Sequence, residues 1–347
     1  MPESKALARQ RAIQRGLAFI YRTACDADNF QYYGHDLLGC FHCIASTSED
    51  AKLREAARSL GQERARHWRS ENPTVPLDAD AFTIINLIFG TYAAGCLGIS
   101  DKSLKLQLQQ AAANFTARDY YGFDPITEPP PSDVPEDCDC GADNRRGRKI
   151  CRSCKKPLEM ISRYGVYIDA LTRSYMAERL GVRLGARYKD VIKWLPAMRP
   201  YRGRENGNNP DFYYSIYAVT HVVYTLNDYS LYKLSPRWLP DEYEFLISNL
   251  DEAIATEDPE AMGEFLDTLK SFGLKDNHRL IRRGMDYLMD TQNADGGWGD
   301  VEAEDVYQSY HPTWTAIDGL RAYAWRGERL SFPNLSKRLE QWADKKR

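Results

Sequence analysis

The chain has 347 residues, of which 43% are hydrophobic and 27% are charged, so it is long enough to bury a large core and does not resemble a disordered or fibrous protein. Its 46 basic and 49 acidic residues give a formal net charge of -3, which provides no overall attraction to nucleic acid or to an anionic membrane. We therefore expect no nucleic-acid partner.

The N-terminal sequence is polar and lacks an apolar signal core. The longest apolar run, around 82–97, is interrupted by polar residues and is short for a bilayer span. We therefore expect no membrane span and a cytoplasmic location. In that compartment the eight cysteines are reduced thiols or metal ligands rather than a disulfide framework.

Apolar residues recur at helical spacing along almost the whole chain, and the alternation typical of half-buried strands is scarce. The pattern predicts about thirteen helices, at 5–22, 31–48, 50–70, 79–98, 101–117, 158–180, 183–195, 211–229, 240–253, 258–272, 276–292, 309–326 and 333–345.

Charged amphipathic helices, such as 50–70 and 276–292, alternate in this order with apolar ones, such as 79–98 and 211–229. A helix that is apolar on most sides must be surrounded by other helices. The alternation therefore predicts an all-α fold, an (α/α)6 toroid in which six inner helices lie inside an outer ring. An open helical solenoid is the alternative interpretation.

Residues 1–121 are expected to form the first part of this toroid. On the predicted helix 31–48, Gln31, His35 and His42 share one stripe, and the neighbouring face carries Asp36, Cys40 and Cys43.

Two short acidic segments, Asp26 to Asn29 and Asp78 to Ala81, precede apolar helices. We expect Asp28 and Asp80 to be helix N-caps, because a carboxylate accepts hydrogen bonds from the free amides of a first turn.

Residues 122–157 break the helical pattern with a proline-rich stretch and few apolar residues, and we expect an inserted element there. Its cysteines, Cys138, Cys140, Cys151 and Cys154, form two close pairs that can bring four thiolates to one tetrahedral ion. Four protein ligands leave no open position, so we expect structural zinc that folds this element. The insert is also a candidate docking surface for a protein partner.

A cluster of basic residues separates the two cysteine pairs: Arg145, Arg146, Arg148 and Lys149. A solvated basic turn is favoured over a phosphate site. A second basic loop, 199–210, contains Arg199, Arg202 and Arg204, which could hold an anionic substrate at a rim or lie on an exposed loop.

The remainder of the toroid is expected in residues 158–347, and its predicted helix 211–229 carries a polar stripe. The stripe consists of Tyr214, Tyr217, His221, Tyr224 and Asp228. Polar groups on an otherwise apolar helix need water, a ligand or buried partners. We therefore expect these tyrosines, together with Tyr310, to contact a substrate.

The run from Arg283 to Trp298 contains a basic residue followed by Gly, a Tyr-Leu pair, and then Gln292, Gly296 and Trp298. It resembles the QW repeat of squalene-hopene cyclases and related terpene cyclases, a superfamily that also includes protein prenyltransferase beta subunits. The resemblance implies that Gln292 caps a helix and Trp298 packs against it, outside the reaction site. It covers about 50 residues well, including the segment from His311 to Leu320.

The resemblance also implies candidate chemistry. In the transferases a histidine near the start of the corresponding helix binds catalytic zinc, but Pro312 shifts His311 by about one residue. The cyclases use an Asp-x-Asp-Asp acid, and neither acidic segment of this chain completes that motif.

We predict an enzyme, of a biosynthetic kind, that binds a small molecule in the central cavity of the toroid. His35, His221 and His311 are predicted as acid-base groups or as ligands of a second metal ion, zinc or iron, while Asp228 and Asp36 orient them or complete the coordination. One alternative is a terpenoid-type cyclase or isomerase with an atypical acid. The other is a non-catalytic binding or scaffold protein with a structural zinc insert.

Overall fold

The computed structural model describes residues 4–142 and 144–344. Within these two ranges the regular secondary structure is helical, and no β-strand is formed beyond isolated β-bridges. The all-α expectation is therefore confirmed for the described residues.

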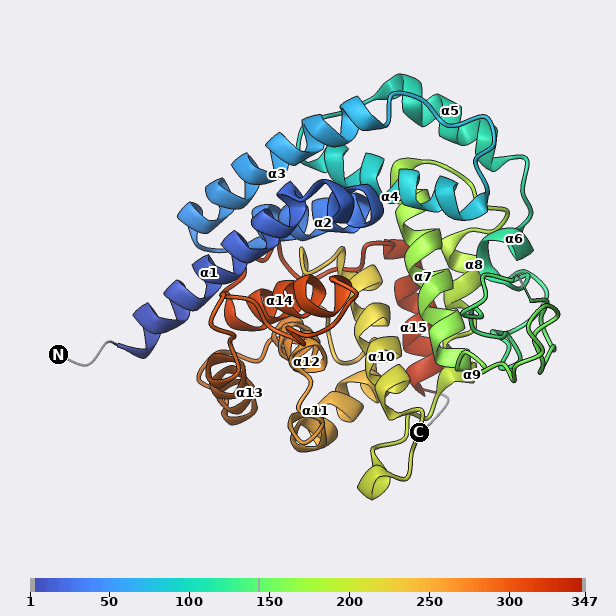
Figure 1. Ribbon diagram of the computed structural model, residues 1–347. Coiled ribbons are helices and arrows are strands. Elements are labelled where there is room, and N and C mark those ends of the chain that lie inside the picture. The colour runs from blue at the N-terminus through green and yellow to red at the C-terminus, as the bar shows by residue number, and fades with distance from the viewer. Residues whose placement is uncertain (1–3, 143, 345–347) are drawn as a thin grey trace.

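The helices follow one another along the chain as shown in Figure 1. They are α1 (Lys5–Cys25), α2 (Ala27–Thr47), α3 (Ala51–Glu71), α4 (Ala81–Cys96), α5 (Lys102–Ala112), α6 (Ala117–Tyr121), α7 (Arg163–Leu180), α8 (Tyr188–Ile192), α9 (Leu195–Met198), η1 (Glu205–Gly207), α10 (Phe212–Asn227), α11 (Pro240–Ile254), α12 (Pro259–Ser271), α13 (Arg279–Asp290), α14 (Tyr307–Leu320), η2 (Pro333–Leu335) and α15 (Ser336–Asp344).

Aspartates begin several of these helices by accepting a hydrogen bond from a first-turn amide. Asp80 caps α4 through the amide of Thr83 at 2.7 Å, as expected. The expected cap at Asp28 is wrong, because α2 begins earlier in the chain and its cap is Asp26, which accepts from the amide of Asn29 at 2.9 Å.

Several predicted bounds also differ. The predicted helix 309–326 is α14, which starts at Tyr307 and ends at Leu320, and the chain then forms an isolated bridge between Tyr323 and Ser48. The predicted helix 183–195 is divided into the short helices α8 and α9, and the predicted helix 101–117 becomes α5 and α6.

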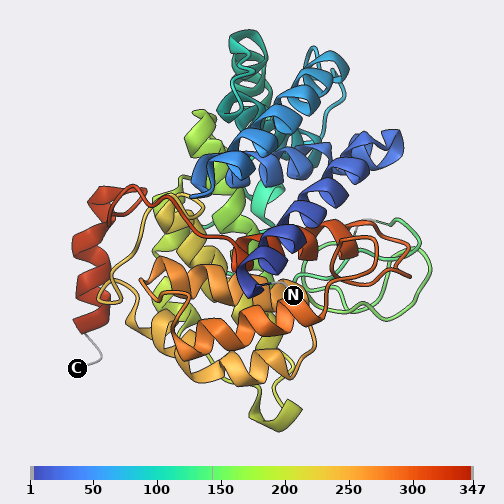
Figure 2. The same ribbon diagram turned by 90° about the vertical axis from the view of Figure 1, so that its left-hand side faces the viewer.

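Six helices contact one another in a cyclic order: α2 packs on α4, α4 on α7, α7 on α10, α10 on α12, α12 on α14, and α14 again on α2. We call these six the ring helices. Other helices pack on the ring from outside, among them α1, α3, α11 and α13 (Figures 1 and 2). Each of these four outer helices contacts the ring helix that follows it in the chain, and α1, α3 and α13 also pack on a second ring helix.

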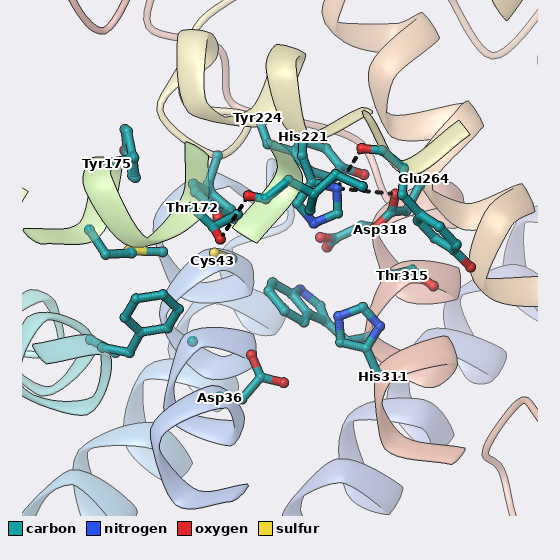
Figure 3. Close-up of a pocket in the computed structure, with 18 of the residues that line it drawn as sticks. Asp36, Cys43, Thr172, Tyr175, His221, Tyr224, Glu264, His311, Thr315 and Asp318 are labelled. Carbon is teal, nitrogen blue, oxygen red and sulfur yellow. Dashed lines mark hydrogen bonds and ion pairs between the residues drawn. The ribbon is translucent and has the colours of Figure 1, made fainter. Parts of the chain in front are cut away.

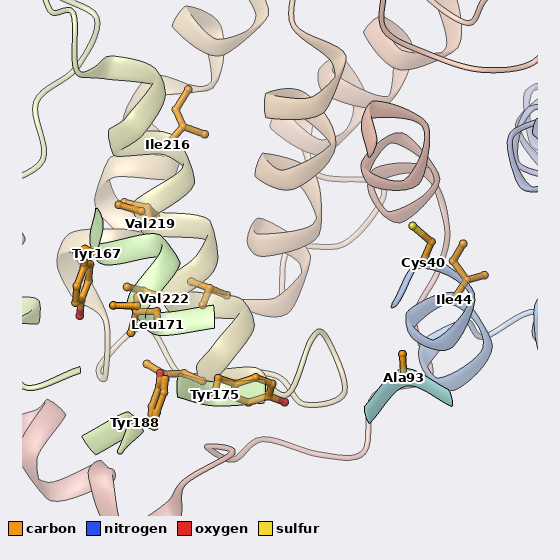
Figure 4. Close-up of a cluster of buried hydrophobic side chains, with 14 of the residues drawn as sticks. Cys40, Ile44, Ala93, Tyr167, Leu171, Tyr175, Tyr188, Ile216, Val219 and Val222 are labelled. Atoms are coloured by element: carbon orange, nitrogen blue, oxygen red, sulfur yellow. The ribbon is translucent and has the colours of Figure 1, made fainter. Parts of the chain in front are cut away.

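The core between neighbouring ring helices consists of closely packed aliphatic and aromatic side chains. Figure 4 shows Leu171 and Tyr167 of α7 beside Val219 and Val222 of α10, all of them buried. Burying a side chain of this size stabilises the fold by about 1.5–3 kcal/mol. The ring is thus held by contacts between residues that are distant in sequence.

The first and last helix pairs meet at Trp298, which is completely buried between α13 and α14. Its indole Nε1 donates to the carbonyl of Leu288 at 2.8 Å. A Cβ placed on Gly16 of α1 would lie 2.9 Å from the Trp298 ring, so the indole needs a glycine there. Gln292 donates to the carbonyl of Ala12 in α1 at 2.9 Å. The segment therefore fastens the end of the ring to its beginning.

Gly296 shows why this turn requires glycine. Its φ is +97°, and an added Cβ would lie 2.9 Å from the Cβ of Arg15. Arg15 in turn donates to the carbonyl of Ala294 at 2.7 Å. Any other residue would therefore be strained and would also separate the turn from α1.

None of the helices in the described ranges is both long enough and apolar enough to cross a membrane.

Candidate active site and metal centre

The ring helices enclose a cavity of about 410 Å³. All six contribute side chains to its wall. The ionisable groups of the wall include seven carboxyls and four imidazoles: Asp36, Asp169, Asp228, Glu260, Glu264, Asp267, Asp318, His35, His42, His221 and His311. Aromatic rings fill much of the remaining surface.

Most of the predicted site residues lie in this wall. They are His35, Asp36, Tyr214, Tyr217, His221, Tyr224, Asp228 and His311. Tyr310 does not line the cavity: it lies on the neighbouring face of α14, is fully buried, and donates its hydroxyl to Asp36 at 3.0 Å. Gln31 is exposed and also lies outside the wall.

His311 and Glu260 form an ion pair in the wall, with 3.2 Å between His311 Nδ1 and Glu260 Oε1 (Figure 3 shows His311 on α14). Burial alone would lower the pKa of the imidazole, but the Glu260 carboxylate outweighs it and raises the pKa of His311 to about 9. The same pair lowers the pKa of Glu260 against the effect of its burial. His311 is therefore a cation at neutral pH.

His221 and Glu264 lie next to this pair. Burial lowers the pKa of His221 to about 4, so its imidazole is neutral. Its Nδ1 lies 2.8 Å from the carbonyl of Tyr217, an acceptor, so Nδ1 carries the proton and Nε2 is left with a lone pair. The Nδ1 of His221 and Glu264 Oε2 are 3.9 Å apart.

Glu264 differs from an ordinary surface glutamate. Thr220 of α10 hydrogen-bonds its carboxyl oxygen, and the side chain is almost completely buried. Burial, followed by the charge of Glu260, raises the pKa of Glu264 to about 8. Glu264 is therefore a neutral carboxylic acid at neutral pH, beside a neutral imidazole.

Two further carboxyls of the wall are Asp267 on α12 and Asp318 on α14. Ser230 donates to both oxygens of Asp267, at 2.7 and 2.8 Å, and Asp318 is held by Arg321 Nε at 2.6 Å. Burial and the charge of Asp318 raise the pKa of Asp267 to about 7. Asp267 is therefore more readily protonated than an ordinary aspartate.

Asp228 occupies a different part of the wall from His311. It follows the end of α10 with a φ of 60°, accepts a hydrogen bond from the Tyr175 hydroxyl, and pairs with Arg179 at 3.0 Å. Its carboxylate is thus held by α7, and it does not orient His221 as predicted.

His35 and His42 both line the cavity from α2. Burial lowers the pKa of both, to about 4 for His42. Among the described residues, His35, His221 and His311 do not belong to any group of side chains that could hold a metal ion. The structure therefore brings the three histidines to one cavity without gathering them as metal ligands.

The carboxyls of α12 were not predicted as site residues. Glu260, Glu264 and Asp267 are spaced by four and three residues, which places them on one face of a helix. That periodicity is present in the sequence. It is easily overlooked because an acidic stripe on a charged helix is usually a solvated face.

The four cysteines of the insert lie together, with all four sulfurs within 4.8 Å of one another. Neighbouring Sγ atoms, such as those of Cys138 and Cys154, are 3.4 to 3.5 Å apart. A tetrahedral ion with Zn–S bonds of about 2.3 Å requires sulfurs about 3.8 Å apart. Four thiols in this arrangement can bind a metal such as zinc.

The backbone of the insert supports this cluster. The Cys151 amide donates to the carbonyl of Lys156 at 2.9 Å and closes the turn that contains Cys154. The Ser153 amide donates to the sulfur of Cys151 at 3.4 Å. Arg146 is paired with Glu128 and Asp133 at 2.9 and 2.6 Å, so this basic residue holds the insert together.

The loop 199–210 is also held by internal pairs. The side chain of Arg199 is buried and pairs with Glu242 of α11 at 2.5 Å, so this arginine attaches the loop to α11. Arg202 pairs with Glu205 at 2.5 Å on the surface. Neither arginine lines the cavity.

The chain matches no family model, no curated protein and no solved structure.

Proposed function

We propose that the chain is an enzyme that transfers protons to and from a small molecule bound in the cavity. The observation that carries the proposal is the group formed by the His311–Glu260 ion pair, His221 and Glu264, side by side in the wall of a pocket that all six ring helices line. Titratable groups whose surroundings push their pKa values apart are typical of acid-base sites.

Each member of the group has a chemical role in this proposal. Glu264, protonated at neutral pH, is the general acid, and the free Nε2 of His221 is the general base. The His311 imidazolium stabilises negative charge that develops on the substrate. Glu260 fixes the orientation and charge of His311.

The experiment is a comparison of small-molecule extracts before and after incubation with the purified protein, followed by mass spectrometry. We expect the wild-type protein to convert at least one metabolite, and the Glu264→Gln variant to slow that conversion about 100-fold or more. Glu302→Gln, a change of the same kind at an exposed position, is the matched control and should leave the rate unchanged. Loss of conversion in both variants, or in neither, would contradict the role of Glu264. An extract left unchanged by the wild-type protein would favour a binding or scaffold protein.

We propose further that the ring helices and the helices outside them are the two layers of an (α/α)6 toroid. The cyclic contact order of the ring supports this, as does the order in the chain of α1, α3, α11 and α13, each of which precedes a ring helix that it contacts. The segment from Gln292 to Trp298 lies between an outer and an inner helix, and its tryptophan is fully packed. A resemblance to squalene-hopene cyclases and prenyltransferase beta subunits implies the same position.

A second candidate function follows from that resemblance together with Glu264. A neutral carboxylic acid in an aromatic cavity can protonate an alkene, and Glu264 would then be the atypical acid of a terpenoid-type cyclase or isomerase. The test is incubation with an isoprenoid alkene in D₂O. Deuterium at one carbon of a product, absent with Glu264→Gln, supports cyclisation or isomerisation, and an unlabelled product contradicts it.

The insert is proposed to hold one structural zinc ion through Cys138, Cys140, Cys151 and Cys154. The support is the thiol geometry and the small number of apolar residues in 122–157, which leaves metal binding as the source of folding energy. Elemental analysis should find one zinc per chain. A second ion that is lost on His221→Ala would instead support metal-assisted chemistry in the cavity.

A further inference from the structure

The wall of the cavity is rich in carboxyls and contains no lysine or arginine side chain among the described residues. Seven carboxyls face four imidazoles, of which His35, His42 and His221 have lowered pKa values because they are buried. Positive charge therefore enters the wall mainly through His311. A wall with this set of side chains favours a cationic ligand over an anionic one.

Most of these carboxyls are already compensated. Arginines that lie outside the wall pair with Asp169, Asp228 and Asp318. Glu260 is paired with His311. Glu264 and Asp267 have raised pKa values, to about 8 and about 7, because of burial and of neighbouring negative charge.

Asp36 is the exception. Its carboxylate accepts the Tyr310 hydroxyl at 3.0 Å, but it forms no ion pair with any residue in the described part of the chain. Figure 3 shows Asp36 on the side of the cavity opposite Glu264 and Asp318, facing the enclosed space. This half-buried carboxylate can therefore pair with the charged group of a cationic ligand in the cavity.

Aromatic rings surround the same space. The wall contains seven tyrosines together with Phe89 and Trp314. Tyr307 stacks on His311 with ring centroids 4.6 Å apart, and Trp314 meets the same imidazole edge-on at 5.5 Å. The π-faces of aromatic rings attract organic cations, by about 2 kcal/mol or more when water is excluded.

We infer that the cavity binds a small organic cation, an ammonium or guanidinium compound, whose charged group pairs with Asp36 between the aromatic rings. The inference deepens the proposed function and rests on it, since it names the substrate class of that cavity. Its support is the geometry of the wall: one carboxylate without an ion-pair partner, aromatic surroundings, and no competing lysine or arginine among the described lining residues.

Three probes of nearly equal shape test this inference: choline, its neutral carbon analogue 3,3-dimethylbutan-1-ol, and the anion 3,3-dimethylbutanoate. Binding to the purified protein is measured by tryptophan fluorescence and by calorimetry. We expect choline to bind at least about 10-fold more tightly than the neutral analogue, and the anion to bind most weakly.

The variant Asp36→Asn should reduce the preference for choline over the neutral analogue to less than about threefold, because it removes the charge that pairs with the ammonium group. Asp169→Asn is the matched control, because Asp169 lines the same cavity but is already paired with Arg173, and it should keep the preference. Circular dichroism of both variants verifies that they are folded. If the asparagine variant does not fold, Asp36→Glu retains the carboxylate and should keep the preference, whereas its loss there would count against the pairing.

Equal binding of choline and its neutral analogue, tighter binding of the anion, or a preference unchanged by Asp36→Asn would each overturn the inference. The result is distinguishable from failure of the proposed function. Glu264→Gln should retain the preference for choline even though it is expected to lose conversion of metabolites. A protein that shows the preference but converts nothing would keep the inference and contradict the enzyme.

Discussion

The cysteine cluster and the cavity are held together by different forces. The cluster brings together four side chains from a span of seventeen residues that has little apolar surface, so we expect its thiols, together with the metal proposed to bind there, to hold it. The cavity is built from six helices spread over most of the chain, and its polar groups are placed by the packing behind them. The first site should therefore fail locally, whereas the second should fail with the whole ring.

The largest expected effect is on the insert. Cys151→Ser removes one of the four proposed ligands, so we expect loss of the zinc proposed to bind there and rapid proteolytic cleavage within 122–157. Helicity of the ring should remain, because the insert contributes none of the ring helices. Elemental analysis and limited proteolysis measure this, with Cys25→Ser, an exposed thiol far from the cluster in sequence, as control. Unfolding of the whole chain would show that the two regions are not independent.

The second prediction concerns a substitution that should destabilise the ring and leave the insert intact. Trp298→Ala empties a completely buried site between the first and last helix pairs, and should lower the free energy of unfolding by about 3–5 kcal/mol. Urea denaturation followed by circular dichroism measures the loss. Zinc content should be unchanged, and a loss of zinc would contradict the separation of the two regions.

The third prediction concerns the pH dependence of stability that Glu264 gives to the cavity. The pKa of Glu264 is about 8 in the folded chain against 4.5 for a free glutamate, so the folded state retains a proton that the unfolded state has lost. The contribution of Glu264 to stability is therefore fully present below pH 4.5 and is lost as the pH rises through about 8. Glu264→Gln should make the unfolding free energy less dependent on pH in this window. Parallel urea titrations at about pH 5 and about pH 8.5 measure the difference, and an equal pH dependence in both proteins would contradict the raised pKa.

The smallest effect is expected from Arg146→Ala. This partly exposed side chain pairs with Glu128 and Asp133, and exposed pairs contribute about 1 kcal/mol or less. Zinc content should be retained, with a modest increase in the rate of proteolysis in the insert. Complete loss of zinc would show that the pairs, rather than the thiols, hold the insert.

The same contrast explains what could be predicted from the sequence. The spacing of Cys138, Cys140, Cys151 and Cys154 is local, so their clustering followed from the sequence and is confirmed by the structure. Helical periodicity likewise predicted the all-α class. The polar stripes on two helices indicated that His35 and His221 face inward, because residues on one helix face recur at a known spacing, and both side chains line the cavity.

Partners from different helices could not be predicted in this way. The pairing of His311 with Glu260 depends on how deeply α12 and α14 insert beside each other, which no local pattern encodes. Tyr310 was predicted to line the cavity, but its neighbour on α14, His311, does so instead. Tyr310 points to the next face of the helix and donates its hydroxyl to Asp36. The exposed or buried state of the α12 stripe also depended on its place in the ring.

The fastening of α14 to α1 and α2 has a consequence for synthesis. While a growing chain lacks the residues up to Leu320, the hollow has no side wall between α12 and α2, and neither His311 nor Asp318 is present to face it. Nascent chains of increasing length should therefore acquire ligand affinity in one late step rather than gradually. Ligand binding in the cavity would then indicate that α14 has been synthesised and has packed against α12 and α2.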